Sequence, residues 1–551
     1  MGRYLAAIRS YDEASEGALA FRDPLPEAAM IFRSPYPDVE IPGVGLSEFV
    51  LERAEELGDK PALVDGPTGR TITYAQLKGG AHRLAAGLAE RGFQKGDVFA
   101  IFSPNVPEYA LAFHGVAGAG GICTTINPLY TVKELTFQLD HAKAKYLLTI
   151  PQFLDRALEA AENSGVEEVF VLGEAEGATP FAQLLTSDAA PPKVDIDPEN
   201  DLLALPYSSG TTGFPKGVML THHNIVSNIC QSIAPHSTSQ EDVIIGVLPF
   251  FHIYGMTVIM NVAIRVGATV VTMPRFDLEE FLQLLQDHKV TRAYLVPPII
   301  LGLAKHPIVD KYDLSALKVI MSGAAPLGAD LAQAAARRLG QTLIIQGYGL
   351  TETSPVTHMI PDEASKDEPG SIGFLVPNTE AKFVDPASGA ELGTGETGEL
   401  LIRGPQVMRG YLNDPESTAR TVDDDGWLHT GDIGRADENG YFFLVDRLKE
   451  LIKYKGFQVP PAELEAVLLS HPSVSDAAVI PVADEEAGEI PKAYVVLTEE
   501  VAAEDIMSFV AERVAPYKKI RLVEVIDEIP KSASGKILRR VLVDRERSLT
   551  A

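Results

Sequence analysis

YSSGTTGFPKG, residues 207–217, lies between the apolar stretch LLALPY (202–207) and the helical pattern THHNIVSNICQSI (221–233). Its glycines allow the backbone to approach an anion closely, and its hydroxyls and amides donate hydrogen bonds. Lys216 adds a positive charge. The stretch is therefore predicted to be a phosphate-binding loop after a strand, although it does not match the GxxxxGK[ST] pattern. The alternative is a flexible surface loop, but hydroxyl clusters that end in Pro-Lys-Gly are uncommon in linkers.

Strand-like and helix-like stretches alternate on both sides of this loop, from about residue 62 to 150 and again from 242 to 345. In the first run the expected strands are 70–74, 97–102 and 146–150, and the expected helices are 75–91, 107–119 and 131–143. Such alternation predicts mostly parallel sheets with helices on their faces. The predicted fold class is therefore α/β.

The pattern of residues that predicts secondary structure changes toward the C-terminus. Between residues 371 and 443 short strands alternate with Gly, Pro and Asp turns, which predicts a small β-rich lobe. A Lys-rich run, DRLKELIKYKGFQ (446–458), precedes a compact α+β tail. The prediction is a large N-terminal domain, made of two βα-type subdomains and the β-rich lobe, followed by a small C-terminal domain with a boundary near Lys449.

Composition excludes several classes of function. The chain has 551 residues, of which 46% are hydrophobic and 22% charged, and its net charge is −29. Nucleic acids and anionic membrane surfaces require clustered cations, so neither partner is expected. Two distant cysteines, Cys123 and Cys230, exclude a disulfide scaffold and a structural zinc site. No signal peptide, membrane span or SKL-type ending is recognised, so we expect a cytoplasmic location.

Three patterns suggest other chemistry and are interpreted as structural. GTGETG (393–398) fits GxGxxG, but the strand-like ELLIRG follows it where a dinucleotide site needs a helix, so a hairpin turn is predicted. His222 and His223 lack a third metal ligand and are expected to be surface residues in the first turn of a helix. The run 423–425, Asp-Asp-Asp before Gly-Trp, is expected to be a solvated turn.

Five ordered motifs carry a resemblance to a known superfamily: SSGTTGFPKG (208–217), QGYGLTE (346–352), WLHTGD (427–432), VDRLKELIKYKGFQ (445–458) and PKSASGK (530–536). With them the chain resembles the acyl-CoA synthetases, peptide-synthetase adenylation domains and luciferases, and most of all the 4-coumarate:CoA ligases, over about residues 30–540. The resemblance implies an AMP-binding domain at 30–448 and a mobile C-terminal domain at 449–551. Residues 1–29 lie outside the family pattern.

The resemblance implies a site for ATP and Mg²⁺. The residues that it assigns to the β- and γ-phosphates are Ser208, Ser209, Gly210, Thr211, Thr212, Gly213 and Lys216. Thr351 would bind the α-phosphate, and Glu352 would ligate Mg²⁺, which prefers oxygen ligands. Asp432, with Arg447 beside it, would bind the ribose. The adenine slot would be lined by Ala324, Gln346, Gly347 and Tyr348.

The resemblance also implies that the C-terminal domain has two functions. Lys536 would reach the carboxylate and the α-phosphate during adenylation, where it would stabilise developing charge. After the domain moves, coenzyme A would meet residues of the Lys-rich run and one arginine of the large domain. This second set is Lys449, Lys453, Lys455, Gly456, Gln458 and Arg275. Without the resemblance, the run would be interpreted as a solvated basic strip.

The acyl pocket implied by position is Tyr254, Val258, Met321, Ala324, Gly347, Gly349, Pro355 and Val356, with the catalytic His252 at its mouth. Small residues opposite Tyr254 favour a planar aromatic acid. Val258 departs from plant members of the family, which commonly have serine there. An apolar pocket also admits fatty acids, so a medium- or long-chain fatty acyl-CoA ligase stays open.

The chain is therefore predicted to be a two-step, AMP-forming acid:CoA ligase acting on a cinnamate- or 4-coumarate-type acid. The alternatives are a stand-alone adenylating enzyme that loads a carrier protein, a luciferase-like oxygenase and a nucleotide-binding regulatory module. The sequence leaves the physiological acid and the oligomeric state open.

Overall fold

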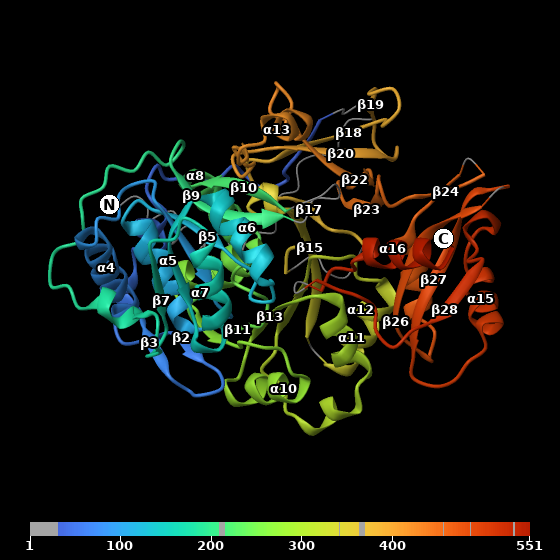
Figure 1. The fold of residues 1–551 in the computed structure, drawn as a ribbon. Helices are drawn as coiled ribbons and strands as arrows, with labels where there is room; N and C mark the ends of the chain where they lie inside the picture. Colours follow the sequence, from blue (N-terminus) through green and yellow to red (C-terminus); the bar gives the residue numbers. More distant parts are fainter. Residues whose placement is uncertain are drawn as a thin grey trace.

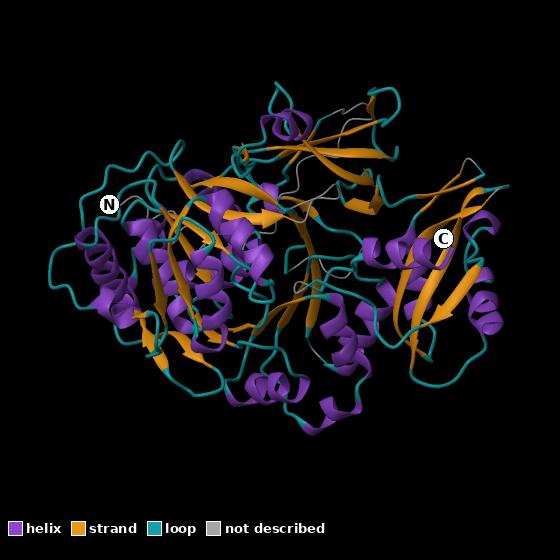
Figure 2. Cartoon of the chain, in the orientation of Figure 1, coloured by secondary structure: helices purple, strands orange, loops and turns teal. Residues whose placement is uncertain are grey.

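The computed structural model describes residues 31–208, 215–340, 342–362, 370–455, 457–484, 486–532 and 535–550, with the side chains of Gln458, Leu549 and Thr550 left aside. Four sheets occur among these residues, three in the N-terminal part and one in the C-terminal part (Figures 1 and 2). This is the mixed α/β architecture that the sequence predicts.

The first large sheet carries the phosphate-loop strands near one edge. Its order is β21 (Gly410–Tyr411), β10 (Lys216–Thr221), β9 (Leu202–Ser208), β5 (Ile122–Thr125), β4 (Val98–Phe102), β6 (Ala144–Thr149), β7 (Glu168–Val171) and β8 (Thr179–Pro180). Strands β9 to β8 are parallel, as predicted. All five residues of β4 are buried, as expected for a parallel strand covered on both faces.

The second large sheet has the order β17 (Phe374–Leu375), β16 (Val356–Met359), β15 (Leu343–Gly349), β14 (Val319–Ser322), β13 (Arg292–Leu295), β11 (Val243–Gly246), β12 (Thr269–Thr272), β2 (Pro61–Asp65) and β3 (Thr71–Thr73). Its strands from β15 to β2 are parallel, and antiparallel strands close both ends. The antiparallel pair β15–β16 carries several of the residues that are predicted to contact the adenine ring and the acyl group.

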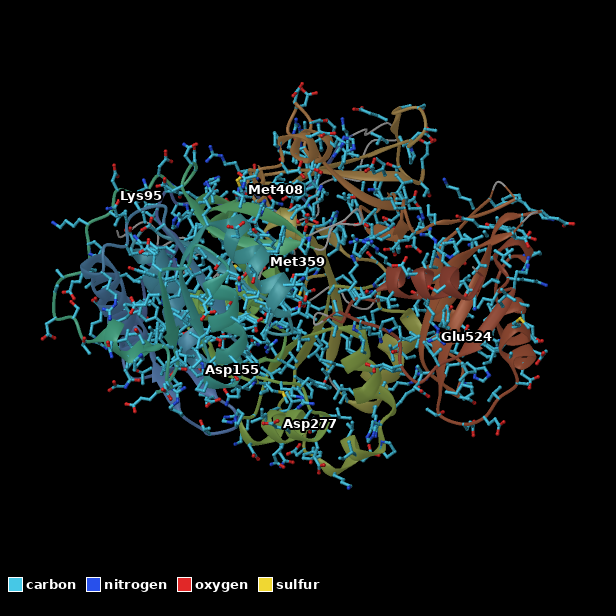
Figure 3. The ribbon with its side chains drawn as sticks, in the orientation of Figure 1. Lys95, Asp155, Asp277, Met359, Met408 and Glu524 are labelled. Atoms are coloured by element: carbon cyan, nitrogen blue, oxygen red, sulfur yellow. The ribbon has the colours of Figure 1, made fainter. Side chains whose placement is uncertain are left out.

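Helices of the N-terminal part cover these sheets, and one core joins both. They are α2 (Leu46–Val50), α3 (Ala54–Leu57), α4 (Tyr74–Glu90), α5 (Pro107–Gly118), α6 (Val132–Ala142), α7 (Leu154–Glu162), α8 (His222–Ile233), α9 (Ala263–Val266), α10 (Leu278–Asp287), α11 (Pro297–Lys305) and α12 (Ala329–Arg338). A single cluster of buried side chains includes Phe99 of β4, Phe113 of α5, Ile229 of α8 and Tyr294 of β13. Met359 and Met408 are buried, whereas Lys95, Asp155 and Asp277 are exposed (Figure 3).

The predicted β-rich lobe is a six-stranded antiparallel sheet with one short helix. Its strands are β1 (Phe32–Arg33), β18 (Glu380–Val384), β19 (Glu391–Leu392), β20 (Gly398–Arg403), β22 (Leu428–Ala436) and β23 (Phe442–Arg447), and the helix is α13 (Pro415–Thr421). GTGETG joins β19 to β20, so a strand follows it as predicted, but the predicted hairpin turn is wrong, because both strands pair with β18 and not with each other. The Oδ1 atom of Asp423 accepts bonds from the Asp425 and Trp427 amides, which makes the expected turn.

The C-terminal part has its own sheet and core. Strands β24 (Ile452–Tyr454), β25 (Phe457–Val459), β26 (Val474–Asp484), β27 (Gly488–Leu497) and β28 (Leu522–Val525) form the sheet, which packs with α14 (Pro461–Leu469), α15 (Ala503–Ala511) and α16 (Arg539–Thr550). The chain passes from one sheet to the other between Arg447 and Ile452. No helix of the described ranges is long and apolar enough to cross a membrane.

The expectation that His222 lies at the surface is also wrong. His222 is buried, because α8 packs its first turn against α2, and its Nδ1 accepts a bond of 3.0 Å from the Leu46 amide. Burial lowers the pKa of His222 to about 4, so the ring is neutral. The capping residue Thr221 predicts correctly that the helix begins at His222. A capping residue does not show which side of the first turn faces the core.

Candidate active site

The predicted phosphate loop is closed by a hairpin. Ser208, which ends β9, and Lys216, which begins β10, are direct antiparallel partners. The two ends of the loop are therefore held side by side at one edge of the first sheet. The predicted ligands Ser209, Gly210, Thr211, Thr212 and Gly213 lie outside the described residues.

The structure brings the start of this loop to the predicted metal ligand. The Ser208 hydroxyl donates to Oε1 of Glu352 at 3.0 Å, and the Tyr411 hydroxyl donates to the same atom at 2.8 Å. Glu352 lies with Thr351 in the short 3₁₀ helix η5 (Thr351–Thr353), just after β15. Three segments that are distant in the sequence thus converge on one carboxylate.

Lys216 rests against neighbouring protein groups. Its Nζ donates to the Ser417 hydroxyl at 2.5 Å, lies 3.6 Å from Oδ2 of Asp414 and sits 4.9 Å from the centre of the Tyr411 ring. Asp414 also caps α13 by accepting from the Ser417 amide. The ammonium group is therefore held at the end of the loop by the start of α13. The residues around Lys216 in the sequence do not predict this contact.

The predicted ribose site is a three-residue cluster in which Asp432 is buried and Tyr348 and Arg447 are half-buried. Asp432 and Arg447 are register partners on β22 and β23, with Nε of Arg447 3.3 Å from Oδ1 of Asp432. The Tyr348 hydroxyl donates to Oδ2 of Asp432 at 2.5 Å. Burial raises the pKa of Asp432, and Arg447 opposes this effect. The carboxylate is fixed in orientation by both partners.

The predicted adenine residues surround the end of the second sheet. Gln346 accepts from the Leu327 amide through Oε1 at 3.0 Å, which holds the turn after β14 beside β15. Ala324 in that turn has a left-handed backbone, with φ of 67°. Gly347 and Tyr348 follow Gln346 on β15. The four predicted residues therefore lie on adjoining segments.

Lys536, from the C-terminal part, interacts electrostatically with Asp432 and Arg447 of the predicted ribose site. Burial, followed by repulsion from Arg447, lowers the pKa of Lys536 to about 8, whereas Glu450 and Asp432 raise it. Burial and then the charge of Lys536 lower the pKa of His252 to about 4. Lys536 therefore lies within electrostatic reach of both Asp432, which is predicted to bind the ribose, and His252, which is predicted at the pocket mouth.

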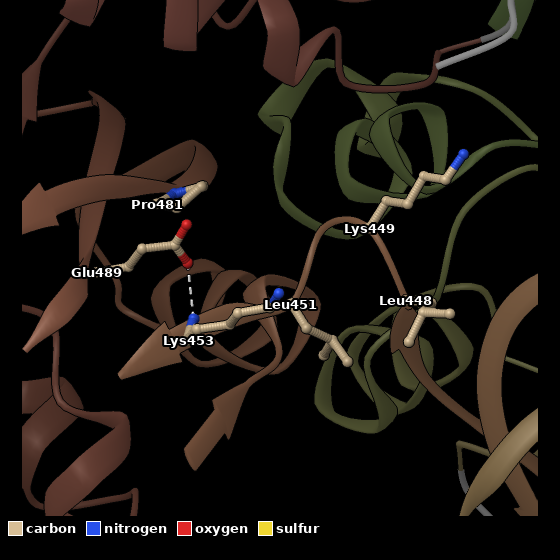
Figure 4. A pocket seen from close by; sticks show the side chains of 6 residues that line it. All are labelled: Leu448, Lys449, Leu451, Lys453, Pro481 and Glu489. Carbon is tan, nitrogen blue, oxygen red and sulfur yellow. Dashed lines mark hydrogen bonds between the residues drawn. The ribbon is translucent and has the colours of Figure 1, made fainter. Parts of the chain in front are cut away.

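The residues predicted to meet coenzyme A are mostly exposed. Lys449 and Lys453 line a pocket with Leu448, Leu451, Pro481 and Glu489, and the Lys453 amide donates to Glu489 at 2.7 Å (Figure 4). Lys455 lies 3.9 Å from the carboxylate of Glu486. Arg275 is exposed after β12. Gly456 and the side chain of Gln458 lie outside the described residues.

The predicted acyl-pocket residues contact one another. Tyr254 and Val258 lie on the π-helix η3 (Tyr254–Val262), and the Tyr254 hydroxyl donates to the Met321 carbonyl at 3.2 Å. A Cβ atom at Gly347 would collide with Cε of Met321, and one at Gly349 would collide with the Pro355 carbonyl. Glycine is therefore required at Gly349, where the obstacle is backbone, whereas a side chain at Gly347 would have to displace the flexible end of Met321. Val258 and Val356 are 2% and 4% exposed.

Two further residues shape this pocket and were not identified from the sequence. Asn228 of α8 donates to the Val356 carbonyl at 2.7 Å and accepts from the Val356 amide at 3.0 Å. Tyr294 pairs in register with Met321, and its ring centre lies 6.4 Å from that of Tyr254. Asn228 had a detectable signal, because it follows Ile225 by three positions and so falls on the apolar face of its helix.

Comparisons with known proteins agree with this geometry. Residues 50–412 match the family model described as AMP-binding enzyme, and residues 463–536 match AMP-binding enzyme C-terminal domain. The 4-coumarate–CoA ligase 3 of Oryza sativa subsp. japonica is 45% identical over 539 residues, covering 96% of this chain and 95% of the relative.

Two solved structures are similar over nearly the whole chain. The anthranilate CoA ligase AuaEII in complex with anthranoyl-AMP matches with a TM-score of 0.85 and 27% identity, covering 93% of this chain and 99% of that one. ATP-bound MatB from Rhodopseudomonas palustris matches with a TM-score of 0.82 and 29% identity, covering 92% and 100%.

Proposed function

The chain belongs to the AMP-binding enzyme family, and on that premise we propose that it is an ATP-dependent, AMP-forming acid:CoA ligase for cinnamate-type acids. The observation that carries the proposal is the convergence of Lys536 with Asp432, Arg447 and His252. A half-buried lysine from the C-terminal part, held beside Asp432 and Arg447, suits a reaction in which charge develops on a phosphate.

The first half-reaction joins the acid to AMP. A carboxylate oxygen of the acid attacks the α-phosphorus of ATP, the bond to the β-phosphate bridging oxygen breaks, and pyrophosphate leaves. Thr351 binds the α-phosphate, Asp432 orients the ribose, and the Lys536 ammonium stabilises the charge between the reacting groups. Most of the rate gain then comes from positioning and fixed charges.

Glu352 suits a magnesium ion that arrives with the nucleotide. A carboxylate is a preferred Mg²⁺ ligand, and one oxygen of Glu352 already accepts two hydrogen bonds that fix its orientation. The described part of the chain holds no cluster of three or more His, Cys, Asp or Glu side chains suited to a metal. Substrate phosphates would complete the coordination, and the ion would neutralise phosphate charge.

The second half-reaction requires a different arrangement of the C-terminal domain. The thiol of coenzyme A gives up its proton to solvent, its sulfur attacks the acyl carbon of the adenylate, and the bond between that carbon and the phosphate oxygen breaks, so AMP leaves with the bonding electron pair. We place the hinge near Lys449, where the chain changes sheets, so that residues 449–551 move as one unit. Lys449, Lys453, Lys455, Gly456, Gln458 and Arg275 then form the proposed path for coenzyme A.

The acid is proposed from the walls of its pocket. At Gly349 the backbone approaches the Pro355 carbonyl closely, Cε of Met321 lies against Gly347, and the Tyr254 ring lies against Gly323. Walls built from glycines and one tyrosine ring suit a flat aromatic acid. Met321, Pro355 and Val356 bound the pocket. These are the observations that favour a planar acid over a flexible chain.

The experiment is a substrate panel assayed for both products. Acid-dependent pyrophosphate release and acyl-CoA formation are measured with cinnamate, 4-coumarate, sinapate, octanoate and palmitate. Cinnamate and 4-coumarate should have the highest kcat/KM. If octanoate or palmitate exceeds both by tenfold, about 1.4 kcal/mol in transition-state binding, the aromatic assignment is wrong. If no acid stimulates pyrophosphate release, the ligase assignment fails.

A further inference from the structure

Helices α11 and α12 of the large domain lie beside the C-terminal domain (Figure 1). A Cβ atom at Gly328, just before α12, would lie 3.5 Å from Cβ of Ala466 in α14. A Cβ atom at Gly535, next to Lys536, would lie 3.0 Å from the Val296 side chain. The two surfaces therefore meet closely around the loop that carries Lys536.

Lys305 makes a polar contact across this interface. It is the last residue of α11, and its Nζ donates to the carbonyl of Leu469 at 3.1 Å and approaches that of Val474 at 3.5 Å. Leu469 is the last residue of α14. Its carbonyl is one of the four that a helix end leaves without an intrahelical partner, and a cation there also complements the helix dipole.

The helix held by Lys305 is joined to the Lys536 loop. Glu465 of α14 forms a two-bond ion pair with Arg539, at 2.7 and 2.8 Å. Arg539 begins α16, three residues after Lys536, and also binds Glu450 at 2.7 Å. The position of α14 therefore constrains the loop that delivers the lysine.

We infer that Lys305 is a positioning residue for the adenylation half-reaction: it caps α14 from the large domain and so seats the C-terminal domain with Lys536 in the site. The inference rests on the proposed ligase function. The contact joins two domains, so it exists only while they are docked in this arrangement. Movement of the C-terminal domain for the second half-reaction would break it.

The test measures the two half-reactions separately in the full-length enzyme. Lys305→Met removes the charge, Lys305→Glu places a negative group against the two carbonyls, and Lys305→Arg keeps the cation. Single-turnover acid-dependent pyrophosphate release should fall about two- to fivefold in Lys305→Met, the range expected for a partly exposed charge at a helix end. The loss should be larger in Lys305→Glu and small in Lys305→Arg.

Attack of coenzyme A on supplied acyl-adenylate should stay within twofold of wild type in every variant. Lys311, an exposed residue that ends the short helix η4 (Pro307–Lys311), provides matched controls, and Lys311→Met and Lys311→Glu should leave both half-reactions unchanged. The inference is overturned if both half-reactions fall together in the Lys305 variants, or if neither changes. Failure of the ligase proposal looks different, because wild type itself would then show no acid-dependent pyrophosphate release.

Discussion

Burial of Lys536 makes its charge sensitive to pH in the working range. The pKa of the ammonium falls to about 8, chiefly because docking removes water from it. The proposed role of Lys536 requires its charged form, so activity should be present below this pKa and should be lost as the pH rises through it. Bound ATP, which is anionic, favours the charged form and shifts the loss upward.

We therefore expect kcat/KM for adenylation, which reports the free enzyme, to decline as the pH rises above about 8. The decline in kcat should begin at higher pH. Lys536→Arg should remove the decline, since a guanidinium keeps its charge, and Lys536→Ala should abolish pyrophosphate release while sparing coenzyme A attack on supplied adenylate. A pH profile of Lys536→Arg identical to that of wild type would assign the titration to another group.

Val258 sets a second test at the residue scale. It is buried one turn after Tyr254 and has no group that hydrogen-bonds to a ring hydroxyl. An unpaired buried hydroxyl costs about 1–3 kcal/mol, so cinnamate should be used nearly as well as 4-coumarate. Val258→Ser should raise the 4-coumarate to cinnamate ratio of kcat/KM. Val258→Ala, which adds space without a hydroxyl, should not, and an equal rise in both variants would show that volume decides.

At the scale of elements, α8 connects the phosphate loop to the acyl pocket. It begins with a capping box between Thr221 and Asn224, directly after β10. Asn228, further along the same helix, forms hydrogen bonds with both the amide and the carbonyl of Val356, the first residue of β16. One helix therefore positions the loop at its first turn and the pocket wall at its second.

Asn228→Ala should damage stability and the pocket together. It leaves the buried amide and carbonyl of Val356 unpaired, at about 1–3 kcal/mol for each group. We expect a lower Tm and a raised KM for the acid, with KM for ATP much less affected. Calorimetry and steady-state kinetics measure both. Asn163→Ala, whose side chain bonds only the Glu159 carbonyl at an exposed helix end, is the control.

Periodicity and capping patterns predict most of these elements to within a few residues. The expected helix 107–119 is α5, and the expected strand 97–102 is β4, because local spacing decides them. Contacts between distant segments are not encoded locally. The pairing of Lys216 with Ser417 and the Asn228 clamp on Val356 depend on tertiary packing, which the spacing of residues does not contain. The roles of the residues carried over from the family stay predictions.

At the scale of the whole molecule, the site exists only when two separately folded parts meet. The C-terminal part has its own core, which includes Leu464, Val479 and Ile506, while the two large N-terminal sheets share another. Asp432 and Arg447 belong to the β-rich lobe, and Lys536 arrives from beyond the sheet change near Lys449. Docking and separation of the two parts should therefore select which half-reaction proceeds.

A reversible cross-link tests this directly. A Cβ atom at Gly328 would lie 3.5 Å from Cβ of Ala466, within the range of disulfide-bonded pairs, and the backbone φ of Gly328 is −63°, which any residue adopts. Gly328→Cys with Ala466→Cys should, when oxidised, lock the docked arrangement. The native Cys123 is buried and Cys230 is partly buried, so neither competes readily for the bond.

The oxidised double variant should release about one equivalent of pyrophosphate per enzyme, because the adenylate forms and is retained. Acyl-CoA formation should stop, since the C-terminal domain cannot move. Adding a reductant should restore turnover within the same sample, and each single-cysteine variant should behave as wild type under both conditions. Continued acyl-CoA formation by fully cross-linked enzyme would show that coenzyme A reaches the adenylate in the docked arrangement. The Lys-rich strip around Lys453 and Lys455 would then need another role.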